Sequence, residues 1–177
     1  HREACPIGRY SNITGQSNSS EGCLPCPIGR YSNTSGSEVC IFCASGKYGT
    51  LPAQTNEMGA CDICERGHYC PGGANHVECP QGRYNNVTQQ QNLTSCIVCD
   101  KGKYGKKKKQ FVESESCITC EKGQYCNGTG LATDCIEGTY NNMTGQNASS
   151  SCTLCGPGKY GTSVAQTYET KACGICE

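Results

Sequence analysis

Nineteen cysteines are the residues of this 177-residue chain with the most chemistry to offer. A cysteine thiolate acts as a nucleophile, a zinc ligand or one half of a disulfide, depending on its surroundings. Seven cysteine pairs have the C-x2-C spacing, as in Cys23 and Cys26 followed by Cys40 and Cys43. Because that spacing resembles a zinc ribbon, the cysteines alone leave both zinc and disulfides open as structural interpretations.

Apart from the cysteines, few residues of the sequence are candidates for catalysis or metal binding. The three histidines, His1, His68 and His76, look too few and too scattered for a metal site or a nucleophile–base pair. We find no paired carboxylates suited to glycoside chemistry and no calcium-binding loop motif. The sequence therefore predicts that the chain is not an enzyme, with no catalytic residue, no bound metal and no cofactor.

Glycosylation sequons decide between zinc and disulfides. N-x-[ST] sequons occur in large excess over chance, at Asn12, Asn18, Asn33, Asn86, Asn92, Asn127, Asn142 and Asn147. Most keep a fixed place relative to the cysteines, which chance would not do. Acceptors of N-linked glycans imply the secretory route and surface loops, and that compartment oxidises thiols. We expect a secreted or cell-surface glycoprotein with disulfides.

Charge and hydropathy argue against two classes of partner, nucleic acid and the membrane. The chain has 15 basic and 15 acidic residues, so its neutral balance gives no general attraction to nucleic acid or to an anionic membrane. No apolar run approaches the roughly 20 residues that span a bilayer, and no signal-peptide segment is visible. We expect no nucleic-acid partner and no membrane span in this segment, with a leader either removed or lying outside it.

An internal repeat sets the positions of these residues. The pattern C-x2-G-x-Y occurs nine times, and a longer period of 56 residues lies over it. Type A modules read G-R-Y-x-N with a sequon, type B modules read G-K-Y-G, and type C modules are short and read G-x-Y-C. The nine modules, in the order A-A-B-C-A-B-C-A-B, span residues 5–25, 26–42, 43–63, 64–78, 79–98, 99–119, 120–134, 135–154 and 155–175, with 176–177 opening a further module.

The repeat also predicts the disulfide pairing. If each opening cysteine bonds to the next cysteine, all but one are used, in the pairs Cys5–Cys23, Cys26–Cys40, Cys43–Cys61, Cys64–Cys70, Cys79–Cys96, Cys99–Cys117, Cys120–Cys126, Cys135–Cys152 and Cys155–Cys173. Cys176 is left unpaired, and we expect its partner in a continuation beyond Glu177. In type C modules the alternative Cys70–Cys79 is also short enough, although it would leave Cys64 and Cys96 in need of other partners.

The apolar content is too low for an ordinary core. Leu, Ile, Val and Phe together number 22, and Trp is absent. Disulfides, each worth about 2–4 kcal/mol, must therefore offset the chain entropy that apolar burial cannot. We predict small disulfide-rich repeats in an elongated β/turn rod with little regular secondary structure, no helix bundle and no large core. Short strands are expected at segments such as 83–85 and 96–98, with each module touching mainly its neighbours.

Basic residues form two further patterns. The run Lys106, Lys107, Lys108 and Lys109 is replaced by uncharged residues in modules 3 and 9, so the fold does not require it. We interpret it as a solvated loop, with contact to an acidic glycan or a neighbouring chain as the sharper alternative. A basic residue or histidine also precedes most module tyrosines, and we expect these side chains to lie over neighbouring apolar groups. Those residues are Arg9, Arg30, Lys47, His68, Arg83, Lys103 and Lys159.

The module resembles a known family. The unit C-x2-G-x-Y … C-x2-C, as in Cys79-PQGRYNN … Cys96-IV-Cys99, is similar to the cysteine-rich repeat of ephrin receptors and more distantly to tumour-necrosis-factor-receptor modules. The resemblance covers essentially the whole chain. It implies a disulfide-laddered region of a surface protein that acts as a spacer or binds a ligand.

Two functions follow as hypotheses. The strict superperiod and the sequon density favour an extracellular structural glycoprotein that self-associates into a surface coat, filament or ciliary appendage, with contacts on the sequon-free type B modules. The alternative is the ectodomain of a receptor or adhesion protein that binds a protein or glycan ligand, for which the lysines of module 6 are the distinct candidate.

Overall fold

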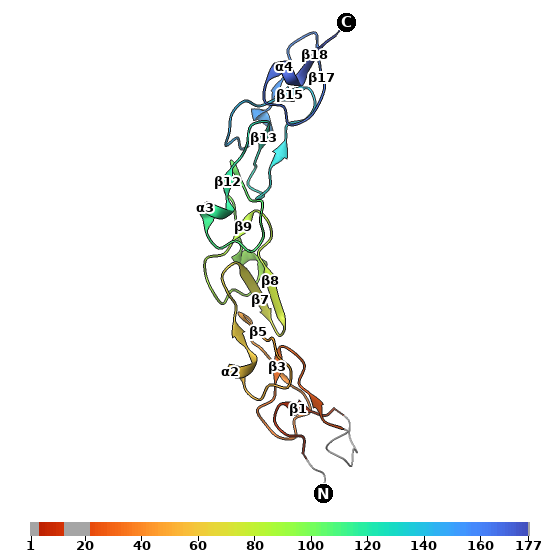
Figure 1. Ribbon diagram of the computed structural model, residues 1–177, viewed down its shortest axis with the longest axis vertical. Helices are drawn as coiled ribbons and strands as arrows, with labels where there is room; N and C mark the ends of the chain where they lie inside the picture. Colours follow the sequence, from red (N-terminus) through yellow and green to blue (C-terminus); the bar gives the residue numbers. More distant parts are fainter. Residues whose placement is uncertain (1–3, 13–21, 177) are drawn as a thin grey trace. The chain divides into compact units, whose positions relative to one another are not determined.

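The computed structural model describes residues 4–12 and 22–176 as small antiparallel strand pairs joined by loops (Figure 1). Each of the nine sheets has two strands, and the strand that carries the module tyrosine pairs with the segment before the next opening cysteine. The strands β9 (Arg83–Tyr84) and β10 (Ile97–Val98), at the segments expected from the sequence, form one such pair. The structure therefore confirms disulfide-rich repeats with little regular secondary structure.

The other strand pairs follow the same order along the chain. They are β1 (Arg9–Tyr10) with β2 (Leu24–Pro25), β3 (Arg30–Tyr31) with β4 (Ile41–Phe42), β5 (Lys47–Tyr48) with β6 (Asp62–Ile63), β7 (His68–Gly72) with β8 (Asn75–Glu78), β11 (Lys103–Tyr104) with β12 (Ile118–Thr119), β13 (Gln124–Tyr125) with β14 (Thr133–Asp134), β15 (Thr139–Tyr140) with β16 (Thr153–Leu154), and β17 (Lys159–Gly161) with β18 (Cys173–Ile175). The longest is the type C hairpin β7–β8, whose register shifts between Tyr69 and Gly72.

Helical structure is confined to single turns in the described residues. Each type B module carries one before its closing cysteine, namely α2 (Glu57–Ala60), α3 (Glu113–Ser116) and α4 (Glu169–Ala172). Two 3-10 turns, η1 (Leu93–Ser95) and η2 (Ser149–Ser151), hold the corresponding place in type A modules. None of the described helices has the length and apolar character needed to cross a membrane.

Nine disulfides join the same pairs that the sequence predicts, from Cys5–Cys23 to Cys155–Cys173. In the type C modules the bonds are Cys64–Cys70 and Cys120–Cys126, so the alternative Cys70–Cys79 is not formed. Cys176 is free and exposed. The disulfide cysteines also supply most of the buried apolar residues, which is why no large core is present among the described residues.

The chain divides into two compact units. The first comprises His1–Glu78 and Val87–Ser95, and the second comprises Cys79–Asn86 and Cys96–Glu177. Inside the first, Cys43, Ala60 and Cys61 form a small buried cluster on which Tyr31 packs. Inside the second, Tyr104 packs with two cysteines of module 7. Each cluster is thus built from neighbouring modules around sulfur.

Backbone hydrogen bonds of the opening cysteines connect successive modules within each unit. The cysteine N–H donates to the carbonyl of the preceding turn glycine, as Cys43 does to Gly29 at 2.9 Å. Its carbonyl accepts from a loop residue of the following module, and the seven donors of this kind are Gly36, Ala53, Gly73, Gln89, Lys109, Gly145 and Ala165. All seven have positive φ. Among the described residues, the four other than glycine in this strained conformation therefore occupy one repeated position, where the backbone turns to reach the neighbour.

The glycine of C-x2-G-x-Y is required for two reasons. It has positive φ in every described module, for example +76° at Gly82. Its α-carbon also faces backbone from two modules further on, because a Cβ on Gly82 would lie 2.1 Å from the carbonyl oxygen of Gly130. Only glycine accommodates both the left-handed conformation and this approach. Three consecutive modules therefore interlock at one residue.

The second glycine of G-K-Y-G explains the type B signature. A Cβ on Gly49, Gly105 or Gly161 would come within 2.1–2.8 Å of the turn glycine in the preceding type A module. These glycines have no positive φ, so the requirement is steric alone. The type B sequence is thus dictated by packing on its type A neighbour.

Candidate functional site

The predicted glycan acceptors are placed where an oligosaccharide has room. Seven of the eight sequon asparagines are exposed, and Asn18 lies outside the described residues. In two sequons the asparagine Oδ1 accepts a hydrogen bond from the backbone N–H of the threonine two positions on. These bonds join Thr94 to Asn92 at 3.1 Å and Thr129 to Asn127 at 3.3 Å. Such tight local turns leave the asparagine amide facing solvent, as an acceptor site requires.

The lysine run of module 6 does not act as one patch. Lys106 donates to Glu121 at 2.9 Å and lies over the Tyr104 ring, with its ammonium 5.3 Å from the ring centroid. Lys109 takes positive φ and donates its backbone N–H to the carbonyl of Cys79. Lys107 and Lys108 are exposed, and neither takes part in an ion pair with another described residue. Lys109 is exposed as well and is in none of these ion pairs, so the side chains of Lys107, Lys108 and Lys109 fit the predicted solvated loop or external contact, whereas Lys106 is paired with Glu121.

The basic residues that precede the module tyrosines mostly satisfy polar groups. In the type B modules, Lys47, Lys103 and Lys159 pair with the first residue of the helical turn, at 2.6–3.0 Å. In type A modules, the guanidinium of Arg9 and of Arg83 donates to the carbonyl of the closing cysteine. The expected apolar contact holds clearly at Arg30, which lies 3.7 Å over the Phe42 ring. At the lysines the observed partner of the ammonium group is a carboxylate, which recurs within reach in each type B module.

The Glu121 carboxylate accepts hydrogen bonds from two side chains, as the Glu113 carboxylate does. Glu121 accepts a hydrogen bond from the Tyr104 hydroxyl at 2.8 Å in addition to the Lys106 bond. Hydrogen bonds from Lys106 and then Tyr104 lower the pKa of Glu121. The same contacts, led by the bond to Tyr104, raise the pKa of Lys106. Because the folded-state pKa of Glu121 is depressed, the stabilisation from this group exists above its unfolded pKa and is lost as pH falls through the folded value.

We predict that substituting Lys106 raises the pKa of Glu121. Lys106→Thr copies the residue of module 3 at this place and removes the hydrogen bond that lowers the pKa of Glu121 most, so the Glu121 titration should move towards the ordinary glutamate range. Carboxyl carbon-13 NMR across the acid range measures this shift directly. Lys107→Thr is the matched control and should leave the titration in place. An unchanged Glu121 pKa in Lys106→Thr would contradict the described network.

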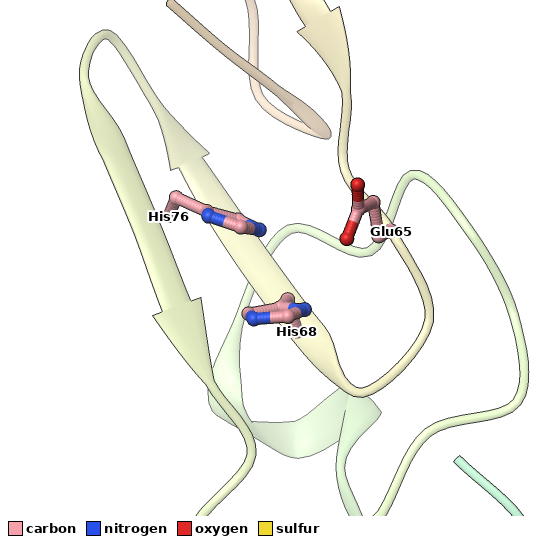
Figure 2. Close-up of side chains that lie close together, drawn as sticks. All are labelled: Glu65, His68 and His76. Carbon is pink, nitrogen blue, oxygen red and sulfur yellow. The ribbon is translucent and has the colours of Figure 1, made fainter. Parts of the chain in front are cut away.

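Module 4 contains a cluster that sequence reasoning missed. Glu65, His68 and His76 place one ligand atom each within 4.8 Å of one another, the one such group of three or more potential metal-binding residues in the described part of the chain. Figure 2 shows the two imidazole rings one above the other, with the Glu65 carboxylate beside them. The expectation that the histidines are too scattered is therefore wrong for His68 and His76, because the β7–β8 hairpin folds them together. His1 lies outside the described residues.

Stacked rings hold this cluster in place. The His76 ring lies between the rings of Tyr48 and His68, with centroid distances of 3.9 Å and 4.0 Å. His68 is only 2% exposed, His76 is half-buried and Glu65 is exposed. Burial first, and then the charges of Glu65 and Asp62, raise the pKa of Tyr48. The Tyr48 hydroxyl is thus close enough to the cluster to sense its carboxylate.

One sequence signal pointed to these residues. Module 7 is the other type C module, and it has Gln124 and Ala132 where module 4 has His68 and His76. Both histidines therefore stand at departures from the 56-residue repeat, at positions that the repeat itself does not fix.

Comparison with known proteins gives no further assignment. Models of known protein families do not match this chain, and no curated protein matches it.

Proposed function

We propose that the chain is part of an extracellular structural glycoprotein whose modules associate with other copies into a surface coat, filament or ciliary appendage. Nine disulfides in 177 residues are typical of extracellular proteins. The observation that carries the architectural role is the interlocking of modules, because six of the turn glycines, from Gly8 to Gly123, lie against backbone from two modules further on. An array of this kind presents equivalent surfaces at regular intervals, which suits repeated contacts between copies. The resemblance to ephrin-receptor repeats agrees with a cell-surface setting.

Type B modules are the proposed contact surfaces. Type A modules carry most of the sequons, and bulky glycans would hold protein partners away from them. In type B module 3, Met58 is 94% exposed and lines an open groove with Ile63 and Gln89. A large apolar side chain held in solvent on a module without sequons of its own fits a contact with a second copy of the chain.

A single substitution tests this surface. Met58→Thr turns Asn56-Glu57-Met58 into a sequon, and Asn56 is exposed, so a glycan would be added beside the groove. The Asn56 Oδ1 that caps α2 can still accept from Gly59, since the glycan attaches to the amide nitrogen. We expect electron microscopy of secreted material to show filaments or sheets for the wild type and dispersed molecules for the glycosylated variant.

The matched control is Met58→Ala, which removes the same thioether without creating a sequon. Assembly should survive in this variant, with at most a modest weakening. If the wild type remains monomeric in its native glycosylated form, or if glycosylated Met58→Thr assembles as the wild type does, the proposed contact is wrong.

A ligand-binding ectodomain is the second candidate, favoured by the three exposed lysines Lys107, Lys108 and Lys109. An acidic glycan would find three ammonium groups that are in no ion pair with another described residue. Replacing them by the module 9 residues, Lys107→Ser, Lys108→Val and Lys109→Ala, should abolish retention on a heparin column if this candidate holds. Lys106→Thr, which removes one charge that is already paired with Glu121, serves as the comparison.

A further inference from the structure

We propose that module 4 binds a divalent transition-metal ion of the zinc class through Glu65, His68 and His76. Two imidazoles and one carboxylate form a ligand set that suits zinc, copper or nickel, whereas calcium and magnesium prefer oxygen ligands alone. The neighbouring cysteine sulfurs are held in disulfides and offer no thiolate.

The dimensions of the cluster are close to those of a bound site. Zinc lies about 2.1 Å from nitrogen and oxygen ligands, so atoms that share one tetrahedral ion are roughly 3.4 Å apart. The three ligand atoms are already within 4.8 Å of one another. For all three to reach one ion, the exposed Glu65 and the half-buried His76 must turn towards His68, because stacked rings do not aim their in-plane lone pairs at a common point (Figure 2). Three protein ligands leave a further position on the ion for water or another donor.

His68 is oriented as a metal ligand usually is. Its Nδ1 lies 3.1 Å from the backbone carbonyl of Arg66, and a carbonyl only accepts hydrogen bonds. In the neutral ring Nδ1 therefore carries the proton, and Nε2 carries the lone pair that binds a metal. A backbone carbonyl on the other ring nitrogen is the common way in which proteins fix a ligating histidine. Tyr48 is stacked on His76 at 3.9 Å, so metal binding exchanges part of this ring contact for the bond to the ion.

Module 7 shows how the same position is built without a metal-binding set. Its equivalent of Glu65 is Glu121, whose negative charge is met by Lys106 at 2.9 Å. Module 3, which precedes module 4, has Thr50 at the place that Lys106 holds in module 6, and module 4 has the two histidines where module 7 has Gln124 and Ala132. The Lys106 ammonium group neutralises the carboxylate of Glu121 in module 7. We assign the neutralisation of Glu65 in module 4 to a metal cation.

Module 7 also supplies the test variant, because Gln and Ala at these places are compatible with the fold. His68→Gln with His76→Ala is compared with the unaltered cluster, both carrying Cys176→Ser so that the free thiol cannot bind metal. Zinc chloride is the probe, and isothermal titration calorimetry measures its binding. The absorbance of bound cobalt is a second readout. His1 is present in both chains and contributes equally to both.

We expect one zinc ion per chain with the cluster intact and about 100-fold or more weaker binding without the two histidines. The reciprocal variant Lys106→Thr, Gln124→His and Ala132→His should create a second site in module 7. Equal zinc affinity and stoichiometry with and without His68 and His76 would overturn the proposal, as would an absence of zinc binding by the intact cluster. In that case the histidines serve only as stacked packing for Tyr48. The assay uses single chains, so its outcome is independent of whether the protein assembles.

Discussion

Reduction of all nine disulfides should unfold the whole chain at neutral pH. Their closed loops have sequence separations of 14–18 residues in the type A and B modules and 6 in type C. In the chain-entropy account, loops of these lengths are worth about 2–3 kcal/mol each. Their combined contribution, roughly 25 kcal/mol, exceeds the 5–15 kcal/mol net stability of an ordinary domain. The amide dispersion of a proton–nitrogen NMR spectrum should collapse when a reductant is added.

Removing one disulfide shows which modules depend on it for their folded structure. Replacing Cys99 and Cys117 by serine should strip amide protection in module 6 and in the modules that share its backbone bonds, as measured by hydrogen exchange. Amides of modules 2 and 3, in the other compact unit, should keep their protection. Cys176→Ser is the control and should change nothing, because that thiol is free and exposed. Well-dispersed amides in the fully reduced chain would contradict this account.

Substitution of the turn glycine of module 5 should be among the most destabilising single changes in the chain. In Gly82→Ala the new Cβ meets the Gly130 carbonyl oxygen at 2.1 Å and its carbon at 2.5 Å, and the residue keeps φ at +76°. The left-handed conformation costs an alanine about 1–2 kcal/mol. The clash with backbone, which cannot rotate away, should add about 1–3 kcal/mol. Urea denaturation followed by tyrosine fluorescence measures the sum.

Two other glycines of the same unit separate these causes. A Cβ on Gly158, at φ +75°, meets no atom within 4 Å in this chain, so Gly158→Ala should show the conformational cost alone. A Cβ on Gly105 meets the Ser116 oxygen at 2.6 Å without positive φ, so Gly105→Ala should show the steric cost alone. If Gly82→Ala is no worse than Gly158→Ala, the proposed interlocking of three modules is wrong.

Much of the architecture follows from the sequence because the constraints are local and repeated. A cysteine that must bond within a short module has few partners, so one rule predicts all nine disulfides. The short strands at Arg83–Tyr84 and Ile97–Val98 also follow from their place between turn residues. Exposure of the sequon asparagines agrees with the same logic, since a glycan acceptor requires a surface loop.

Other features depend on contacts that no local pattern encodes. The sequence shows a glycine after each type B tyrosine, but only the folded backbone shows that Gly105 lies against Gly82. The lysine run reads as four equivalent charges, yet one pairs with Glu121 and another shapes a turn. His68 and His76 look scattered because the seven residues between them conceal the type C hairpin that stacks their rings. Repetition thus fixes what each module does by itself, whereas packing between modules and the return of the chain at hairpins decide which side chains meet.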